Sequence, residues 1–588
     1  MKKGLTIPKL VTVAFILLLV LVQRTPATFA QVSPAQQTGG TLTVALGTEP
    51  DTFNTYTSTL AIEDVFINGF YDTLFVEGLD SAMHTKLATN YAVSPNGTVW
   101  TIDIVHNATF SDGTPLTAND VKYSYDLLGL SEIDHIQVVD NYTLNFFLKA
   151  PYIKDYVLRS IFANYYGKVL PEHIWSKLSD PYSYKNQNPV GSGPWILDKW
   201  VQGQYLTIKA NPNYWGGRPK LDEVIFDFIP SLDTQVLNLQ TGAADMIYVD
   251  PSYVATLMGV PNIKMVTTPQ LRNNYLAFNL NRYPINVKDF RHALAYALDT
   301  NTLVHQVLFG FGTPGQQGWV TPGDPIFYNP NVTQYTYNVA KANQILDNLG
   351  WKMGPDGVRV TPNGTKLQFD FLTASDTPTE LRTGEFIQSN FAQIGVKLNV
   401  VPTTYKTIIS QEFAGQYSIA MLGWFSISVE PSVDMRWHFL PGAFFNVYNY
   451  NSSAYNALFA QYKVATSFDE YRNDIFRMQQ VLSDDLPILC YAFSPSISAY
   501  RTDKFQGWVT PVISDDTFQG ILNWYSLMNL QPATATAASN TASETMTQNS
   551  TAPATSTSMP DMTWVAVGIV AILAILVIAV VSRRKKTS

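Results

Sequence analysis

Alternating apolar and polar side chains predict several strands along the chain. Residues 41–46 and 99–106 are apolar at every second position, as strands with one buried face are. Residues 396–400 repeat this pattern. Residues 224–229 are instead apolar at nearly every position, which is typical of a strand that is covered on both faces of its sheet.

A second periodicity predicts helices, which are clearest in the second half of the chain. Thr117 and Asp120 have the spacing of a capping box, so we expect a helix that begins there and runs through Leu128. Apolar side chains also recur three and four positions apart over residues 290–297, 303–308, 342–349 and 379–394. Because predicted strands alternate with predicted helices, the fold class is α/β with mixed sheets.

The start of the chain has the pattern of a targeting segment. Residues 1–30 combine a basic start, a short apolar run and a stretch of small residues, which predicts a secretory signal peptide. One alternative is an N-terminal anchor that is not cleaved. Another is a pilin-type processing site, because the sequence Lys3-Gly4-Leu5 resembles the sites of some archaeal surface proteins.

The end of the chain predicts a membrane anchor. Residues 531–562 are rich in Ser, Thr, Ala and Pro, which is typical of a flexible stalk. Residues 563–582 carry no charge and are long enough for a transmembrane helix, and the basic residues within 583–588 indicate the cytoplasmic side. The predicted localisation is therefore the cell membrane, crossed once, with the ectodomain outside and the C-terminus in the cytoplasm.

The composition indicates which classes of function suit this chain and which do not. Of 588 residues, 46% are hydrophobic and only 14% are charged, so the chain can build a sizeable core. The formal net charge of −8 argues against nucleic acid as a partner. Sequons for N-glycosylation, which fit an exposed glycoprotein, occur at Asn96, Asn107, Asn141, Asn331, Asn363, Asn451 and Asn549.

Local signatures of catalysis are missing from the sequence. It contains no HExxH, GxSxG or GxxxxGK[ST] motif, and its seven His residues form no pair four positions apart. The single cysteine, Cys490, lies in an apolar run and reads as a small core residue. We therefore predict no catalytic residues, no metal ligands and no cofactor, and the chain is not expected to be an enzyme.

Four longer segments carry a family resemblance. They are residues 110–121 (FSDGTPLTANDV), 189–195 (PVGSGPW), 211–217 (NPNYWGG) and 287–297 (VKDFRHALAYA). They resemble, in family order, the signatures of the family 5 extracellular solute-binding proteins, which are the oligopeptide/dipeptide-type receptors of ABC importers. The resemblance extends over residues 41–530.

The resemblance implies a fold and a set of partners. The fold is a two-lobed clamshell like that of periplasmic binding proteins (type II, cluster C-like), with an extra inserted domain. Lobe I comprises residues 41–75, 190–269 and 488–530, the insert comprises residues 76–189, and lobe II comprises residues 270–487. A small-molecule solute lies between the lobes, and the implied partners are the permease and ATPase subunits of the importer.

The resemblance also implies where the solute binds. Peptide-binding members carry an Asp that pairs with the ligand's ammonium group, and Ile427 stands at that place here. The sequence therefore favours a neutral solute such as an oligosaccharide. Aromatic stacking and hydroxyl contacts for it would come from the segment that follows Gly423, with further candidates matched by position. The predicted ligand-binding residues are Trp424, Phe425, Ser426, Ser428, Glu430, Phe53, Asn54, Tyr56, Asn274 and Tyr275.

Three functions stay open on the sequence alone. The main prediction is an importer receptor for an oligosaccharide or another neutral solute. The first alternative is a receptor of the same class for di- or oligopeptides, with Glu430 as the substitute partner of the ammonium group. The second is a structural or adhesion protein of the cell surface, which would neither enclose a ligand nor close around one.

Overall fold

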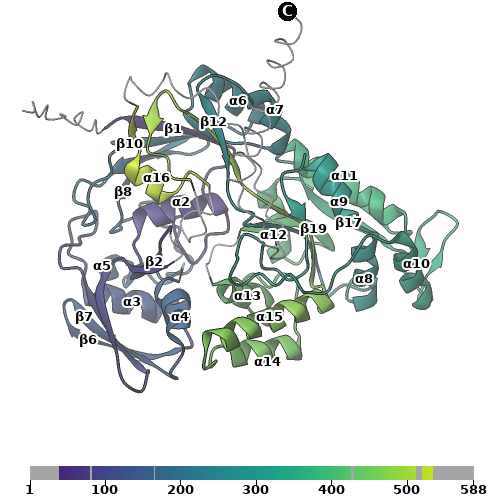
Figure 1. Cartoon of the computed structure of the whole chain (residues 1–588), viewed down its shortest axis with the longest axis horizontal. Coiled ribbons are helices and arrows are strands. Elements are labelled where there is room, and N and C mark those ends of the chain that lie inside the picture. The colour runs from purple at the N-terminus through teal and green to yellow at the C-terminus, as the bar shows by residue number, and fades with distance from the viewer. Residues whose placement is uncertain (1–38, 80–81, 165, 426–429, 511–519, 534–588) are drawn as a thin grey trace, which may run out of the picture. The chain divides into compact units, whose positions relative to one another are not determined.

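The computed structural model describes residues 39–79, 82–164, 166–425, 430–510 and 520–533 (Figure 1). They all fall within the first of two compact units of the chain, residues 1–538. The predicted signal peptide, the predicted transmembrane helix and nearly all of the predicted stalk lie outside the described residues.

A seven-stranded mixed sheet forms the first lobe. In spatial order its strands are β12 (Ile263–Thr267), β21 (Ile497–Arg501), β11 (Met246–Tyr248), β1 (Thr41–Leu46), β10 (Glu223–Phe228), β9 (Tyr205–Ala210) and β8 (Trp195–Val201). β1 runs parallel to β10 and β11, and the other pairs are antiparallel. Leu42 and Val44 pack on one face with Phe66 of helix α2 (Ala61–Phe70), and Ala45 packs on the other with helix α6 (Leu232–Thr241). Both faces of the sheet are therefore covered.

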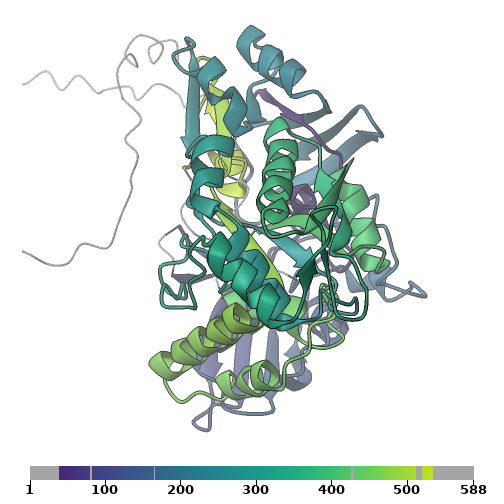
Figure 2. The same ribbon diagram turned by 90° about the vertical axis from the view of Figure 1, so that its right-hand side faces the viewer.

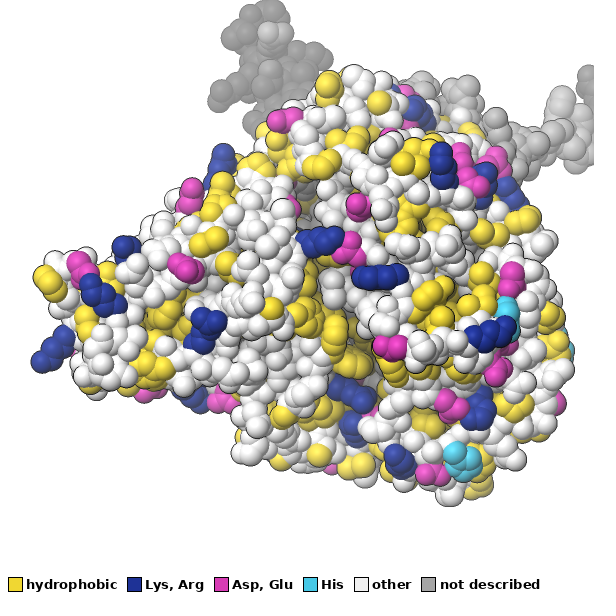
Figure 3. All heavy atoms as spheres, turned by 180° about the vertical axis from the view of Figure 1, so that it is seen from behind, with side chains coloured by type: hydrophobic (Ala, Val, Ile, Leu, Met, Phe, Trp, Pro, Cys, Tyr) yellow, Lys and Arg dark blue, Asp and Glu magenta, His cyan; other side chains and the backbone are white. Residues whose placement is uncertain are grey.

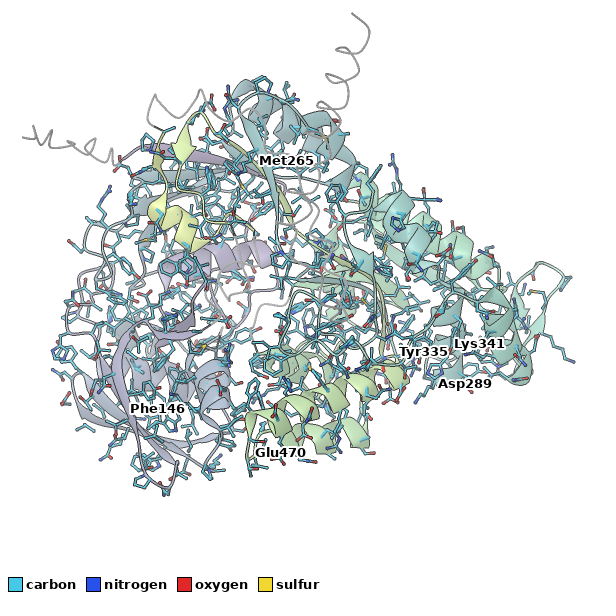
Figure 4. All side chains as sticks on the ribbon, in the orientation of Figure 1. Phe146, Met265, Asp289, Tyr335, Lys341 and Glu470 are labelled. Atoms are coloured by element: carbon cyan, nitrogen blue, oxygen red, sulfur yellow. The ribbon has the colours of Figure 1, made fainter. Side chains whose placement is uncertain are left out.

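The insert is a four-stranded antiparallel sheet with helices on one face. Its strands, in spatial order, are β4 (Ala88–Val93), β5 (Val99–Ile104), β7 (Thr143–Leu148) and β6 (Ile133–Asp140). Helix α3 (Ala118–Leu128) begins with the expected capping box, in which the Thr117 amide donates to Asp120 Oδ2 at 2.8 Å. Phe146 (Figure 4) is fully buried, and its ring meets Phe162 of the π-helix η1 (Val157–Phe162) edge-on at 4.9 Å.

A six-stranded mixed sheet forms the second lobe. In spatial order its strands are β14 (Thr313–Pro314), β20 (Ile488–Ser494), β13 (Arg272–Phe278), β19 (Ile419–Phe425), β17 (Gln368–Ala374) and β18 (Lys397–Thr403). Helices α8 (Lys288–Ala297), α10 (Val339–Asn348) and α11 (Pro378–Ala392) pack on one face and are nearest to the viewer in Figure 2. The core on the other face includes α12 (Tyr405–Phe413), α13 (Pro431–Phe439), α14 (Ser453–Tyr462) and α15 (Phe468–Asp485).

Shorter elements complete the described chain. The short strands are β2 (Phe75–Glu77), β3 (Met83–Thr85), β15 (Lys352–Met353), β16 (Arg359–Val360), β22 (Phe505–Gln506) and β23 (Gln531–Pro532). The short helices are α4 (Lys154–Tyr156), α5 (Glu172–Trp175), η2 (Pro251–Tyr253), α7 (Val254–Leu257), α9 (Thr300–Thr302), η3 (Leu303–Val307) and α16 (Trp524–Asn529). At the outer end of the second lobe, Tyr335 and Lys341 (Figure 4) both contact Tyr296. The two tyrosine rings lie 5.1 Å apart, and Lys341 Nζ donates to the Tyr296 hydroxyl at 2.6 Å.

Within the described residues, the chain crosses between the two large sheets twice. The first crossing joins β12 to β13, and the second joins β20 to β21. The two crossings are bonded to each other, because the Thr268 amide donates to the Ser496 carbonyl (3.0 Å) and the Ser496 amide donates to Thr268 Oγ1 (2.8 Å). These paired segments are the two chain connections between the sheets in the described part of the chain.

Most predicted elements are present in the structure. The strands at 41–46 and 99–104 are confirmed, and so are the helices around residues 290–297, 342–349 and 379–392. Residues 303–307 form the π-helix η3 rather than an α-helix. Strand β10 alternates between buried and half-buried side chains, because one of its faces is covered less completely. Cys490 is a fully buried residue of β20, as predicted.

The strand pairing in the two sheets differs from one of the predicted lobe boundaries. Those boundaries assign residues 488–530 to lobe I, but β20 pairs with β13 along its length in the second sheet. The chain returns to the first sheet only at β21. Strand pairing therefore moves the second crossing to residues 495–496.

Glu132, a buried carboxylate of the insert, contacts the second lobe. Glu132 lies within reach of Lys463 Nζ and of the Arg436 guanidinium, 3.7 Å away, and it accepts a hydrogen bond from the Tyr156 hydroxyl at 2.8 Å. Burial alone would raise the pKa of Glu132, but the two cations and the hydrogen bonds lower it to about 2. The ionised form is therefore the one that the folded protein stabilises.

We expect the Glu132 cluster to weaken in acid. Because the pKa of Glu132 falls from 4.5 to about 2 on folding, its contribution is fully present above pH 4.5 and is lost as the pH falls towards 2. The free energy of unfolding should lose about 3 kcal/mol over this window through Glu132 alone. Urea unfolding from pH 2.5 to 7 should show that the gap between wild type and Glu132→Gln closes in acid. The exposed Glu385→Gln is the matched control, and a gap that does not depend on pH would contradict this assignment.

Candidate ligand-binding site

A cleft of about 610 Å³ lies between the two large sheets. The first lobe contributes Thr48, Ile62, Asp250 and Ser496, and the second contributes Arg272, Asn274, Asp376, Glu380, Phe425 and Tyr491. Seen from behind, the boundary between the lobes is hollowed and lined by hydrophobic side chains, with cationic and acidic side chains near its middle (Figure 3). The crossing segment that contains Ser496 closes one side of this cleft.

The cleft carries charges of both signs. Arg272, the first residue of β13, lies with its guanidinium 3.6 Å from Glu380 and 5.4 Å from the centre of the Phe425 ring. Glu380 lies in the first turn of α11, and burial raises its pKa although Arg272 acts against the shift. Asp250 reaches the cleft from the first lobe and accepts a hydrogen bond from the Thr379 hydroxyl of the second lobe at 2.5 Å. The two lobes therefore already meet through polar groups.

A smaller cavity of about 140 Å³ adjoins the cleft and shares Arg272 and Phe425 with it. We call it the aromatic cavity. Its first-lobe wall consists of Ser58, Thr59, Leu60 and Asp64, and Tyr166 of the insert also lines it. The second lobe contributes Tyr275, Tyr405, Ile409, Glu412, Phe413, Leu422, Gly423, Trp424, His438, Phe445, Val447 and Tyr448.

The second-lobe wall of the aromatic cavity is ordered by hydrogen bonds between side chains. The hydroxyls of Tyr275 and Tyr448 lie 2.9 Å apart, and His438 Nδ1 lies 3.3 Å from the Tyr448 hydroxyl. Gly423 has no side chain at a point where a Cβ would lie 2.5 Å from Arg272 Nε. The small residue of the Gly-Trp pair thus leaves room for the guanidinium between the cleft and the cavity.

The first-lobe wall is held by a different buried carboxylate, Glu63. Its two oxygens accept hydrogen bonds from the amides of Asp51, Thr52, Thr59 and Leu60 and from the Ser58 hydroxyl, at 2.7–3.2 Å. Because Glu63 lies in the first turn of α2, these bonds fold residues 51–60 back onto the start of that helix. They fix the positions of Ser58, Thr59 and Leu60 against the cavity.

The structure brings four of the predicted ligand-binding residues together. Trp424 and Tyr275 line the aromatic cavity, Asn274 lines the cleft, and Phe425 lines both. Trp424 is packed edge-on against His438 and Phe445, with ring centres 4.3 and 4.9 Å away. Asn274 is bonded through Nδ2 to the Ser494 hydroxyl at 2.7 Å.

The other predicted residues lie elsewhere. Phe53 is fully buried in the first-lobe core, Asn54 bonds the carbonyls of Pro181 and Tyr184, and Tyr56 packs against Tyr182, so none of the three lines the cleft or the aromatic cavity. They follow β1 in a loop that turns into the lobe rather than towards the solute. Ser426 and Ser428 lie outside the described residues.

Glu430 is a buried helix cap. It precedes α13, accepts hydrogen bonds from the Ser432 amide (3.2 Å) and from the Ser160 hydroxyl of the insert (2.8 Å), and is fully shielded from solvent. It lines neither the cleft nor the aromatic cavity. Its carboxylate joins the insert to the second lobe, which differs from the predicted contact with an ammonium group.

Local sequence patterns did not reveal the ionisable residues of the site. Arg272, Glu380, Glu412, His438 and Asp64 come from separate elements, and none belongs to a recognisable local motif. The only available signal was position, because Arg272 stands two residues before the predicted Asn274. Their convergence depends on strand pairing and on the contact between lobes.

Comparisons with known proteins give a consistent result. A family model described as "Bacterial extracellular solute-binding proteins, family 5 Middle" matches residues 82–446. The oligopeptide-binding protein AppA of Bacillus subtilis (strain 168) is 25% identical over 493 residues, which are 80% of this chain and 89% of AppA. The glutathione-binding protein GsiB of Salmonella typhimurium (strain LT2) is 29% identical over 373 residues, which are 61% of this chain and 68% of GsiB.

A solved structure shows the same fold. The oligopeptide-binding protein AppA from Bacillus subtilis, in complex with a nonapeptide, superposes with a TM-score of 0.76 at 23% identity. The match covers 85% of this chain and all of that one. The two-lobed fold that the family resemblance implies is thereby confirmed.

The predicted localisation requires correction. The prediction was a single-pass position in the cell membrane, whereas the matching family is described as extracellular. Within the described part of the chain, no helix is both long and apolar enough to cross a bilayer. The longest there is α15, with 18 residues, and its sequence carries charges along its length. The predicted span itself, residues 563–582, lies outside the described residues.

We expect the Glu63 side chain to control the first-lobe wall. Glu63→Ala removes the acceptor of five hydrogen bonds and leaves buried amides without a partner, which should cost about 2–4 kcal/mol of the free energy of unfolding. Urea unfolding should be compared with that of the exposed control Glu385→Ala. Equal stability of the two variants would show that Glu63 does not hold the loop.

Proposed function

Because this chain belongs to the bacterial extracellular solute-binding proteins of family 5, we propose that it is the substrate-binding receptor of an ABC importer and that its solute is a peptide. The single observation that carries the peptide assignment is the mixed charge of the cleft. Arg272, Glu380 and Asp250 line one space of about 610 Å³ that opens between the lobes.

A zwitterionic ligand suits this arrangement. Removing the carboxylate or the ammonium group of a peptide from water is costly unless a charge of opposite sign replaces the water. Arg272 offers a guanidinium to the carboxylate, and Glu380 and Asp250 offer carboxylates to the ammonium group. Backbone amides of the ligand can bond with uncharged polar groups of the cleft such as Asn274 and Ser496.

The oligosaccharide prediction has weaker support. It rested on a neutral cleft and on Trp424 as a stacking platform. The cleft is charged, and Trp424 is packed against His438 and Phe445 at the edge of a small cavity. The relatives are named for binding oligopeptides and glutathione. These observations together favour the peptide alternative.

The binding cycle follows from the connections between the lobes. Thr379 bonds Asp250, and Lys406 Nζ lies 2.6 Å from Asp51, so polar contacts across the cleft are available to a closed form. A ligand that bridges both lobes adds contacts that exist only when they approach. Closure excludes water and strengthens the polar contacts inside. The importer's permease would then receive the solute from the closed form. A structural surface protein needs no such cleft.

We expect peptides to stabilise the protein and oligosaccharides to leave it unchanged. A peptide at about 100 times its dissociation constant should add roughly 2.7 kcal/mol to the free energy of unfolding. Thermal shift against tri- to nonapeptides and a panel of oligosaccharides measures this directly.

The charged cleft gives this experiment a matched pair of variants. Arg272→Gln removes the cation that faces the peptide carboxylate and should weaken binding by about 10–100-fold. Arg382→Gln, at an exposed position of α11, should bind as the wild type does. Stabilisation by an oligosaccharide and by no peptide would overturn the proposed function. Equal binding by both variants would remove Arg272 from the site.

A further inference from the structure

The aromatic cavity contains buried polar atoms that have no partner in the protein. Among the described residues, Glu412 Oε1, His438 Nε2 and Trp424 Nε1 make no hydrogen bond. Glu412 and His438 are only 3% and 2% exposed, and both line the cavity. A buried polar atom without a partner is costly, and native proteins keep few of them. Glu412 Oε1 and the neutral imidazole of His438 can accept hydrogen bonds, so donors on a ligand group would complete both, whereas Trp424 Nε1 is itself a donor.

The protonation states of the residues that line the aromatic cavity limit the kinds of ligand group that it can bind. Glu412 comes from α12, and burial raises its pKa well above the usual range. Burial also lowers the pKa of His438 to about 3, so this imidazole is neutral and Nε2 or Nδ1 can accept a hydrogen bond. The other titratable groups that line the cavity are the hydroxyls of Tyr166, Tyr275, Tyr405 and Tyr448, together with Asp64 and Arg272. Only Arg272, which the cavity shares with the cleft, is cationic.

The remaining wall is aromatic. Tyr275, Tyr405, Trp424, Phe445 and Tyr448 surround the same space from strands β13 and β19, helix α12 and the loop after α13. Aromatic rings attract cations through their negative faces, and the attraction grows when water is excluded. The volume of about 140 Å³ admits a group about as large as a benzene ring, because a dry cavity of about 150 Å³ holds benzene.

We propose that the aromatic cavity is a specificity pocket for a cationic side chain of the bound peptide, with Glu412 as its counter-charge. The inference rests on the proposed function, because the peptide backbone must lie in the adjoining cleft to direct the side chain inward. A lysine side chain brings an ammonium group with three donors. These donors can form hydrogen bonds with Glu412 and His438, while the methylene chain contacts the aromatic rings.

Ion pairing in this pocket has a consequence for protons. Burial raises the pKa of Glu412 and so favours its protonated form in the empty pocket. An ammonium group beside it favours the ionised form, so Glu412 gives its proton to the buffer as the ligand binds. Affinity for a cationic peptide should therefore rise with pH, and calorimetry in buffers of different ionisation enthalpy should detect release of up to one proton.

Matched peptides test the pocket. Calorimetry on the purified protein would compare each lysine-containing tripeptide with its norleucine analogue, which keeps the chain length and lacks the ammonium group. We expect the lysine peptide to bind at least about tenfold more tightly. Glu412→Gln keeps the size of the side chain, and it should bring the ratio close to one and abolish proton release. The exposed Glu385→Gln should keep the wild-type ratio.

A small cation tests the pocket independently of peptide binding, and so independently of the proposed function. n-Butylammonium should raise the melting temperature of the wild type and of Glu385→Gln but not of Glu412→Gln, whether or not any peptide binds. Peptide binding without a lysine preference and without a response to n-butylammonium would overturn the cationic pocket and leave the peptide receptor intact. A response to n-butylammonium that depends on Glu412, together with no binding of any peptide, would overturn the proposed function and support a pocket for another cationic solute.

Discussion

Two hydrogen bonds between Thr268 and Ser496 tie together the only segments of the described chain that cross between the two large sheets. The arrangement of the site depends on this pairing. It sets where β12 ends and β13 begins, and so brings Arg272 to the edge of the cleft. The crossings lie side by side, so both described chain connections between the two sheets are at the same place.

Buried carboxylates hold together other parts of the structure, and each has a different set of partners. Glu63 holds the loop after β1 through amide donors, and Glu132 joins the insert to the second lobe through two cations. Glu430 caps α13 and reaches the insert through Ser160. Each of these carboxylates is satisfied within the protein. Glu412 differs because it lines the aromatic cavity and its Oε1 has no hydrogen-bond partner among the described residues. This difference separates a structural carboxylate from one that is available to a ligand.

The structure places some of the predicted site residues at the cleft or the aromatic cavity and others elsewhere. Trp424 and Phe425 were predicted from the family's ligand-binding segment, and Asn274 and Tyr275 from their position where the second lobe begins. All four line the cleft or the aromatic cavity. Phe53 was predicted from its place after β1, but its ring fills the first-lobe core, since Glu63 folds that loop inward. Glu430 was predicted as a substitute for a missing acidic residue. A Glu directly before a proline-led helix satisfies the amides of that helix, and here it does so.

The sequence by itself determined part of the secondary structure, the α/β class and the family, because these depend on local periodicity and on contiguous motifs. The capping box at Thr117 and the alternation of β1 are examples in which neighbouring residues contain the whole signal. Only the tertiary structure decided the chemistry of the site. Arg272, Glu380 and Glu412 are separated along the chain by up to 140 positions, and each looks like an ordinary surface charge in its own segment. Burial makes these residues candidates for ligand binding, because an unpaired buried charge is costly. Their burial depends on how the lobes pack.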